Sequence, residues 1–73
     1  MSKADEMFEE LGYKKQRCNK NFIVYTDLIS IKEICFYIKP MKFQVLIKNE
    51  PAWIDMQELQ AINEKVKELK WNE

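Results

Sequence analysis

The chain has 73 residues, of which 47% are hydrophobic, and its 12 basic and 12 acidic side chains give a formal net charge of zero. This length fits one domain, residues 1–73, and the hydrophobic content supports a packed core rather than a disordered chain. With no histidine and a single glycine, the sequence excludes imidazole chemistry and a glycine-rich phosphate loop.

The first segment, residues 2–11, is predicted to form a helix with Ser2 as its N-cap. Four apolar residues fall on one face of this helix: Ala4, Met7, Phe8 and Leu11. Gly12 follows directly, at the position where a left-handed C-terminal cap needs a residue without a side chain. The segment is therefore predicted to be a capped amphipathic helix.

Residues 13–48 are rich in β-branched and aromatic side chains with a period near two, which is typical of strands. We expect three or four strands, from the ranges Tyr13–Cys18, Asn21–Thr26, Ile31–Lys39 and Lys42–Lys48. The segment between the second and third ranges fits either a loop or a continuation of a strand.

Pro40 and Met41 separate the last two predicted strands. Because proline cannot take the positive φ of the common two-residue hairpin turns, we expect a longer loop built on a type I turn. If residue 38 pairs with residue 43, one face of this hairpin collects six large apolar side chains. This face is predicted to be the core face: Ile34, Phe36, Ile38, Phe43, Val45 and Ile47.

Residues 55–70 are predicted to form the second helix. Asp55 is the N-cap and Glu58 the third helical residue, as a capping box requires. The predicted buried stripe consists of Met56, Leu59, Ile62, Val66 and Leu69. Trp53 and Trp71 flank this helix, and we expect each to close one end of the core.

The order helix, strands, helix contains no strand–helix–strand crossover, so the sheet is predicted to be antiparallel. Each helix has a single apolar face. We therefore expect an α+β two-layer sandwich with both helices on the same face of the sheet.

The two ends of the chain resemble small proteins from phages and prophages of Gram-positive bacteria. The residues that carry the resemblance are Ala4-Asp5, Phe8 to Tyr13, Ile54 to Lys65 and Glu68 to Trp71. That family usually has a glycine before its final tryptophan, where this chain has Lys70. The resemblance implies a helix–sheet–helix fold in a protein without an assigned activity, and it supplies no catalytic or binding residue.

The zero net charge conceals a partition along the chain. Residues 1–12 carry −3, residues 13–48 carry +6 and residues 49–73 carry −3. A basic sheet with aromatic residues can bind nucleic acid by neutralising phosphates and stacking bases. The candidate nucleic-acid contacts are Lys14, Lys15, Arg17, Lys20, Lys39, Lys42 and Lys48. The alternative is a solvated lysine-rich face that keeps edge strands from pairing.

The sheet face away from the helices also has apolar residues that indicate a protein interface. The candidate interface residues are Tyr37, Leu46, Cys35 and Tyr25, with Ile23 as the alternative to Tyr25. We favour a small non-enzymatic protein-interaction module, bound to a partner protein or to a second copy and encoded by a mobile element. Nucleic-acid binding is the alternative function.

Catalysis is not expected. Carboxylate pairs such as Glu6/Glu10 lie at helical spacing on outward faces, and Ser2 and Ser30 lack a histidine to activate them. Cys18 and Cys35 are expected to be reduced strand residues, with a disulfide or a zinc site completed by other groups as alternatives.

We expect no cofactor, no metal, no small-molecule substrate and no membrane partner. Charged residues begin at Lys3 and no apolar run follows, so the sequence predicts no secretory signal and a cytoplasmic location.

Overall fold

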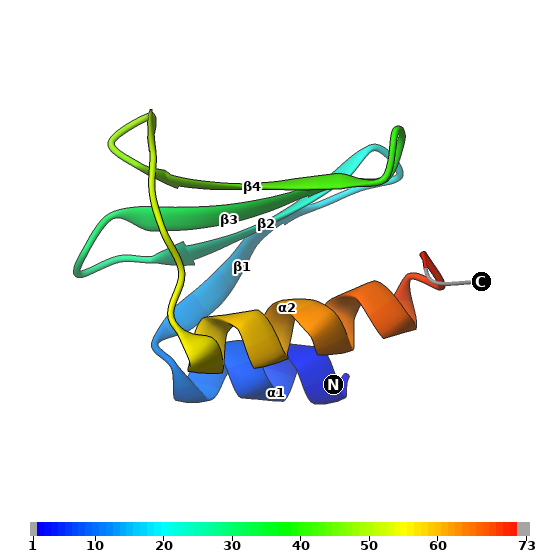
Figure 1. Ribbon diagram of the computed structural model, residues 1–73, viewed down its shortest axis with the longest axis horizontal. Coiled ribbons are helices and arrows are strands. Elements are labelled where there is room, and N and C mark those ends of the chain that lie inside the picture. The colour runs from blue at the N-terminus through cyan, green and yellow to red at the C-terminus, as the bar shows by residue number, and fades with distance from the viewer. Residues whose placement is uncertain (1, 72–73) are drawn as a thin grey trace.

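The structure is a computed structural model that describes residues 2–71, so residues 1, 72 and 73 of the predicted domain lie outside it. Along the chain, one helix precedes five strands and a second helix follows them (Figure 1). The elements are α1 (Lys3–Glu10), β1 (Tyr13–Cys18), β2 (Phe22–Asp27), β3 (Lys32–Tyr37), β4 (Lys42–Ile47), β5 (Glu50–Pro51) and α2 (Met56–Glu68). This arrangement confirms the predicted α+β class.

Both helices begin at the predicted caps. The Asp5 N–H donates to Ser2 Oγ (3.0 Å) at the start of α1. At α2, the Glu58 N–H donates to Asp55 Oδ1 (2.8 Å) and the Asp55 N–H donates to Glu58 Oε1 (2.9 Å), which completes the capping box. Gly12 follows α1 with a φ of +96°, a conformation that side chains strongly disfavour.

The sheet is antiparallel throughout, in the order β1-β2-β3-β4-β5. It has five strands rather than the three or four predicted, because Glu50 and Pro51 turn back against the end of β4. This last strand is only two residues long and lies at the sheet edge, where the missing N–H of Pro51 is tolerated.

The predicted pairing of β3 with β4 was wrong by two residues. Ile34 pairs with Val45 and Phe36 with Phe43, whereas residue 38 was expected to meet residue 43. Ile38 lies just outside β3, and its N–H donates to Asn21 O (2.9 Å) in the β1–β2 turn instead of pairing with β4. A shift of two residues keeps every side chain on its predicted face.

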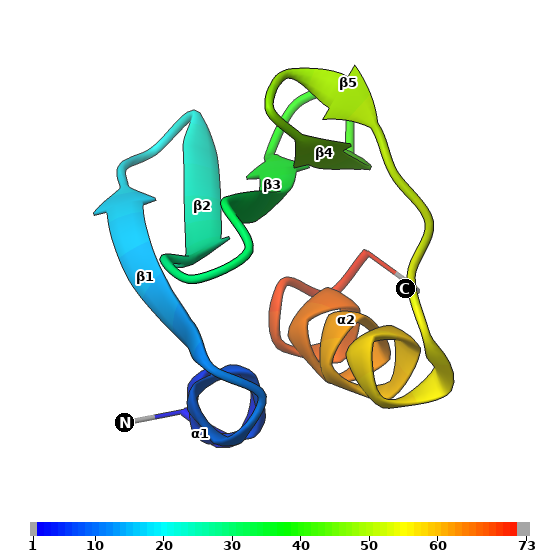
Figure 2. The same ribbon diagram turned by 90° about the vertical axis from the view of Figure 1, so that its left-hand side faces the viewer.

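Both helices cover one face of the sheet, which leaves the other face without a helix (Figure 2). The sheet rises away from the helices toward β4 and β5, so the predicted core face is only partly buried. Ile34, Phe36 and Val45 are buried and Ile38 is partly buried, but Phe43 and Ile47 remain 43% and 39% exposed.

The two tryptophans behave differently. Trp71 closes the core as predicted, with its ring centroid 6.1 Å from that of Phe36. Trp53 is 88% exposed, so its predicted core role was wrong. The link between β5 and α2 runs along the outside of the molecule and carries Trp53 with it (Figure 2).

Candidate functional site

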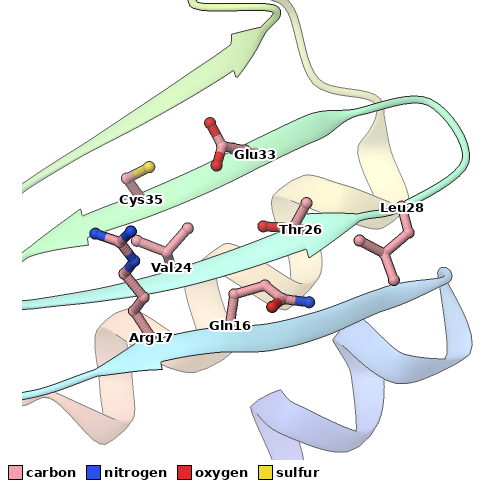
Figure 3. Close-up of a pocket in the computed structure, with 7 residues that line it drawn as sticks. All are labelled: Gln16, Arg17, Val24, Thr26, Leu28, Glu33 and Cys35. Atoms are coloured by element: carbon pink, nitrogen blue, oxygen red, sulfur yellow. The ribbon is translucent and has the colours of Figure 1, made fainter.

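The helix-free face of the sheet carries side chains that alternate with the core residues along each strand. Nine side chains from the inner three strands point to this face: Phe22, Val24, Thr26, Glu33, Cys35, Tyr37, Lys42, Gln44 and Leu46. At its centre lies a hollow of about 430 Å³ (Figure 3), whose lining includes Arg17, Glu33 and Cys35.

A β-bulge shapes the edge of this central hollow. Lys15 pairs with Tyr25 and Arg17 pairs with Val24, so Gln16 is an extra residue in β1. As a result Gln16 and Arg17 both point to the hollow, with the Arg17 guanidinium beside Val24 and Cys35 (Figure 3). The hollow holds one basic and one acidic side chain, so its charge favours neither sign of ligand.

The predicted protein interface comes together only in part. Tyr37, Leu46 and Cys35 lie on the helix-free face, but Cys35 is only 8% exposed. Burial raises the pKa of the Cys35 thiol, and the charge of Glu33 raises it further, so this thiol is a poor nucleophile. Both cysteines are free.

Tyr25 was wrongly assigned to the interface. It pairs with Ile34 on the core face, is 1% exposed, and stacks on Phe8 with ring centroids 4.1 Å apart. Its alternative, Ile23, pairs with Phe36 and is buried on the same side. Because Ile23 and Tyr25 are alternate residues of β2, both side chains point to the core face and neither lies on the helix-free face.

The candidate nucleic-acid contacts divide into groups. Lys15 points to the helices, where its Nζ lies 2.8 Å from Asp5 Oδ2, and Lys48 lies in the β4–β5 turn. Lys14 and Arg17 pair with β2 residues of the helix-free face. The other three lysines lie where the β1–β2 and β3–β4 turns meet: Lys20, Lys39 and Lys42.

These turns enclose a second hollow of about 560 Å³, which we call the end hollow. It is lined by Lys20, Asn21, Phe22, Tyr37 and Lys39. Phe22 and Tyr37 are directly paired across β2 and β3, so their side chains start from adjacent positions on the helix-free face. Sequence reasoning identified both lysines and Tyr37, but it missed Phe22, which only the strand pairing places there.

Large apolar side chains gather at the opposite end of the molecule, which faces the viewer in Figure 2. We call this the apolar end: Leu28, Ile29 and Ile31 in the β2–β3 turn, Ile47 at the end of β4, Trp53 and Met56. Ile47 pairs with Lys32, whose Nζ lies 2.8 Å from Glu58 Oε1 in the first turn of α2. This ion pair holds the strand ends beside the start of α2.

Sequence reasoning missed the apolar end, although the β2–β3 turn contained a signal. Turns are normally built from glycine, proline, asparagine, aspartate and serine. Here the sequence between Asp27 and Lys32 is Leu-Ile-Ser-Ile, with three large aliphatic residues in four positions.

Two partly buried polar networks lie on the helix side. Burial opposes ionisation of Asp5, but hydrogen bonds from Lys15 and Tyr25 and the charge of Lys65 hold its pKa below the ordinary value. Burial and the bond to Asp5 raise the pKa of Tyr25. These shifts keep the carboxylate charged and the phenol neutral, so the network stabilises the fold and is unsuited to proton transfer near pH 7.

The second network has the same design around Glu58. Burial opposes its ionisation, but hydrogen bonds from Lys32, Tyr13 and the Asp55 N–H hold the pKa of Glu58 below its ordinary value. Burial and the contact with Glu58 raise the pKa of Tyr13. Within residues 2–71, no three Cys, Asp or Glu side chains form a group that could hold a metal ion.

No protein-family model, curated protein or solved structure matches this chain. The resemblance of its two ends to small phage proteins therefore stays a prediction. No helix among the described residues has the length and apolar character needed to cross a membrane.

Proposed function

We propose that this protein is a small non-enzymatic interaction module that associates with a second copy of itself through the apolar end. The observation that carries the proposal is the β2–β3 turn, where Leu28, Ile29 and Ile31 are 64%, 95% and 52% exposed. Large apolar side chains that are exposed at one end of a molecule indicate a protein interface. Folding alone does not require aliphatic residues at this turn.

The turn presents these side chains in a fixed conformation. Ile31 has a φ of 60°, which is rare for a β-branched residue, and such strain costs on the order of 1–3 kcal/mol. The Ile31 N–H donates to Asp27 O (2.8 Å) and the Ile29 N–H donates to Asp27 Oδ1 (2.9 Å). A prearranged apolar tip loses little conformational entropy on binding.

A standard interface takes about 800 Å² from each partner, roughly a seventh of the 5311 Å² that this chain exposes. A stable dimer would have to bury an area of this order around the apolar end. In a two-fold contact each pairing occurs twice. The rim of this end carries both signs of charge, with Lys48 in the β4–β5 turn, Glu50 at the start of β5 and Asp27 at the end of β2.

Sedimentation equilibrium over a series of protein concentrations tests the proposal. We expect the wild-type chain to form a dimer, and Ile29→Glu to raise the dimer dissociation constant roughly 100-fold or more, because a carboxylate would enter the apolar contact twice. Ile29 is 95% exposed, so the change should leave the monomer fold intact. In a Trp71→Phe background, Trp53 emission should shift to shorter wavelength as the dimer forms.

Met41→Glu is the matched control. Met41 is also an exposed apolar turn residue, but it lies in the β3–β4 turn at the other end of the molecule. This variant should dimerise like the wild type. A wild-type chain that stays monomeric at the highest concentration, or equal dimerisation of the Ile29→Glu variant, would overturn the proposal.

A further inference from the structure

We propose that the end hollow is a binding site for single-stranded nucleic acid, with Phe22 and Tyr37 as the stacking surface and Lys20, Lys39 and Lys42 as the phosphate contacts. The site is separate from the apolar end, so this inference does not rest on self-association. The two sites lie at opposite ends of the sheet (Figure 1).

The aromatic pair suits stacked bases. Phe22 and Tyr37 are direct cross-strand neighbours on the helix-free face, where no helix covers them. Tyr37 is 37% exposed, and its Oη donates to Gln44 Oε1 (3.0 Å), which fixes the ring on the sheet surface. Aromatic rings on a sheet accept unpaired bases by stacking, whatever the base sequence.

The charge around the hollow suits a phosphate backbone. None of its five lining residues is acidic, and two of them are lysines. Lys42 pairs with Tyr37 and so extends the basic surface along β4. The segments 13–26 and 34–49, which supply both turns, contain seven basic residues and no acidic residue. Such a potential attracts polyanions and makes their binding dependent on salt.

The two turns are tied together, so the lysines keep their positions around the rings. The Asn21 and Phe22 N–H groups both donate to Asn19 Oδ1, at 2.7 Å and 3.0 Å. The Ile38 N–H donates to Asn21 O (2.9 Å) and links the β1–β2 turn to the β3–β4 turn. This link places Lys20 beside Lys39 before any ligand arrives.

Single strands fit the site better than a duplex. A duplex hides its base faces within the stack, so the aromatic pair would contribute nothing to binding it. The acidic helices form the other layer of this small domain and would repel a long, stiff duplex more than a strand that can bend away. The ligand class is therefore an unpaired strand, DNA or RNA.

Fluorescence anisotropy with labelled oligothymidylate, at two or more salt concentrations, tests the inference. We expect weak affinity whose logarithm falls with the logarithm of salt with a slope of about −2, since three phosphates contribute about −0.7 each. Tyr37→Ala should weaken binding about 5- to 150-fold, whereas Tyr37→Phe should retain it. Lys20→Gln combined with Lys39→Gln should reduce the slope to about −0.7.

Lys67→Gln is the matched control, because the 67% exposed Lys67 side chain lies on α2, in the helix layer on the other face of the sheet. It should bind like the wild type. Three outcomes would overturn the inference: no salt dependence, unchanged binding by the Tyr37→Ala variant, or equal affinity for a duplex of the same length. If a poly-glutamate peptide bound as tightly as the oligonucleotide, the ligand class would be acidic protein segments rather than nucleic acid. That result would also overturn the inference.

Discussion

Tyr25 shows how a single polar atom can be held inside a small core. Its ring packs among Phe8 and Phe36, while its hydroxyl donates to Asp5, which also contacts Lys15 and Lys65. Tyr25→Phe should lower the free energy of unfolding by about 1.5–3 kcal/mol, because a charged acceptor loses a buried hydrogen bond. Urea denaturation measures the change.

Tyr37→Phe provides the comparison for this prediction. It removes the same atom, but from a phenol on the exposed face that donates to Gln44. We expect a change within about 0.5 kcal/mol, as for most surface substitutions. Equal losses in the two variants would contradict the role assigned to the Asp5 network.

The face assignment of Tyr25 could not be made from its identity. Tyrosine occurs both in cores and at interfaces. Because alternate residues of a strand point to opposite faces, the face of Tyr25 is known only once another residue of β2 has been assigned to a face. The sequence did contain that neighbour. Ile23 and Tyr25 share parity, and both pair with the buried residues Ile34 and Phe36 of the next strand. Strand pairing, which is non-local, was the missing information.

At the scale of elements, the N-terminus of α2 depends on its cap. Asp55→Ala removes the acceptor for the Glu58 N–H and should lower the free energy of unfolding by about 0.5–2 kcal/mol. Asp55→Ser keeps an acceptor and should recover most of this loss. Thermal unfolding followed by circular dichroism measures both variants. If Asp55→Ala is neutral, or if serine gives no recovery, the cap does not stabilise the fold as argued.

The helices were predicted from the sequence more closely than the sheet pairing was. Caps, apolar stripes and Gly12 act within a few residues, so local sequence determines where α1 and α2 begin and end. The β3–β4 register depends instead on the conformation of residues 38–41, where Met41 takes a φ of 65° and Ile38 bonds to another hairpin. These two features shift the β3–β4 pairing by two residues from the predicted register.

For the molecule as a whole, the two ends of the sheet differ in chemistry. The charge partition along the sequence predicted a basic sheet, and the structure places Lys20 and Lys39 in the lining of the end hollow and Lys42 opposite Tyr37 on β4. The sequence could not predict that Phe22 would join them, nor that Leu28, Trp53 and Met56 would share one end. Both groupings unite segments that are distant in the chain, so they depend on the complete topology.

The carboxylates and phenols of the two polar networks, which are four of the groups with shifted pKa values, predict how the stability of the whole fold depends on pH. Asp5 and Glu58 have lower pKa values in the folded protein than their ordinary 3.8 and 4.5. Their contribution is therefore present above about pH 4.5 and is lost as the pH falls below these values, since the unfolded chain then binds more protons. Tyr13 and Tyr25 have folded pKa values above the ordinary 10.0. Their contribution is complete below pH 10 and is lost as the pH rises further, because only the unfolded chain then ionises.

Without histidine, the chain should show a level melting temperature between about pH 5 and pH 9, with a decline on each side. Thermal unfolding across pH 2–12 measures this profile. Tyr25→Phe should flatten the alkaline decline, because one of the two shifted phenols is removed, while the acid decline from Glu58 should remain. A melting temperature that changes steeply between pH 6 and pH 8, or an alkaline decline that is unchanged in the Tyr25→Phe variant, would show that other groups control the stability of the fold.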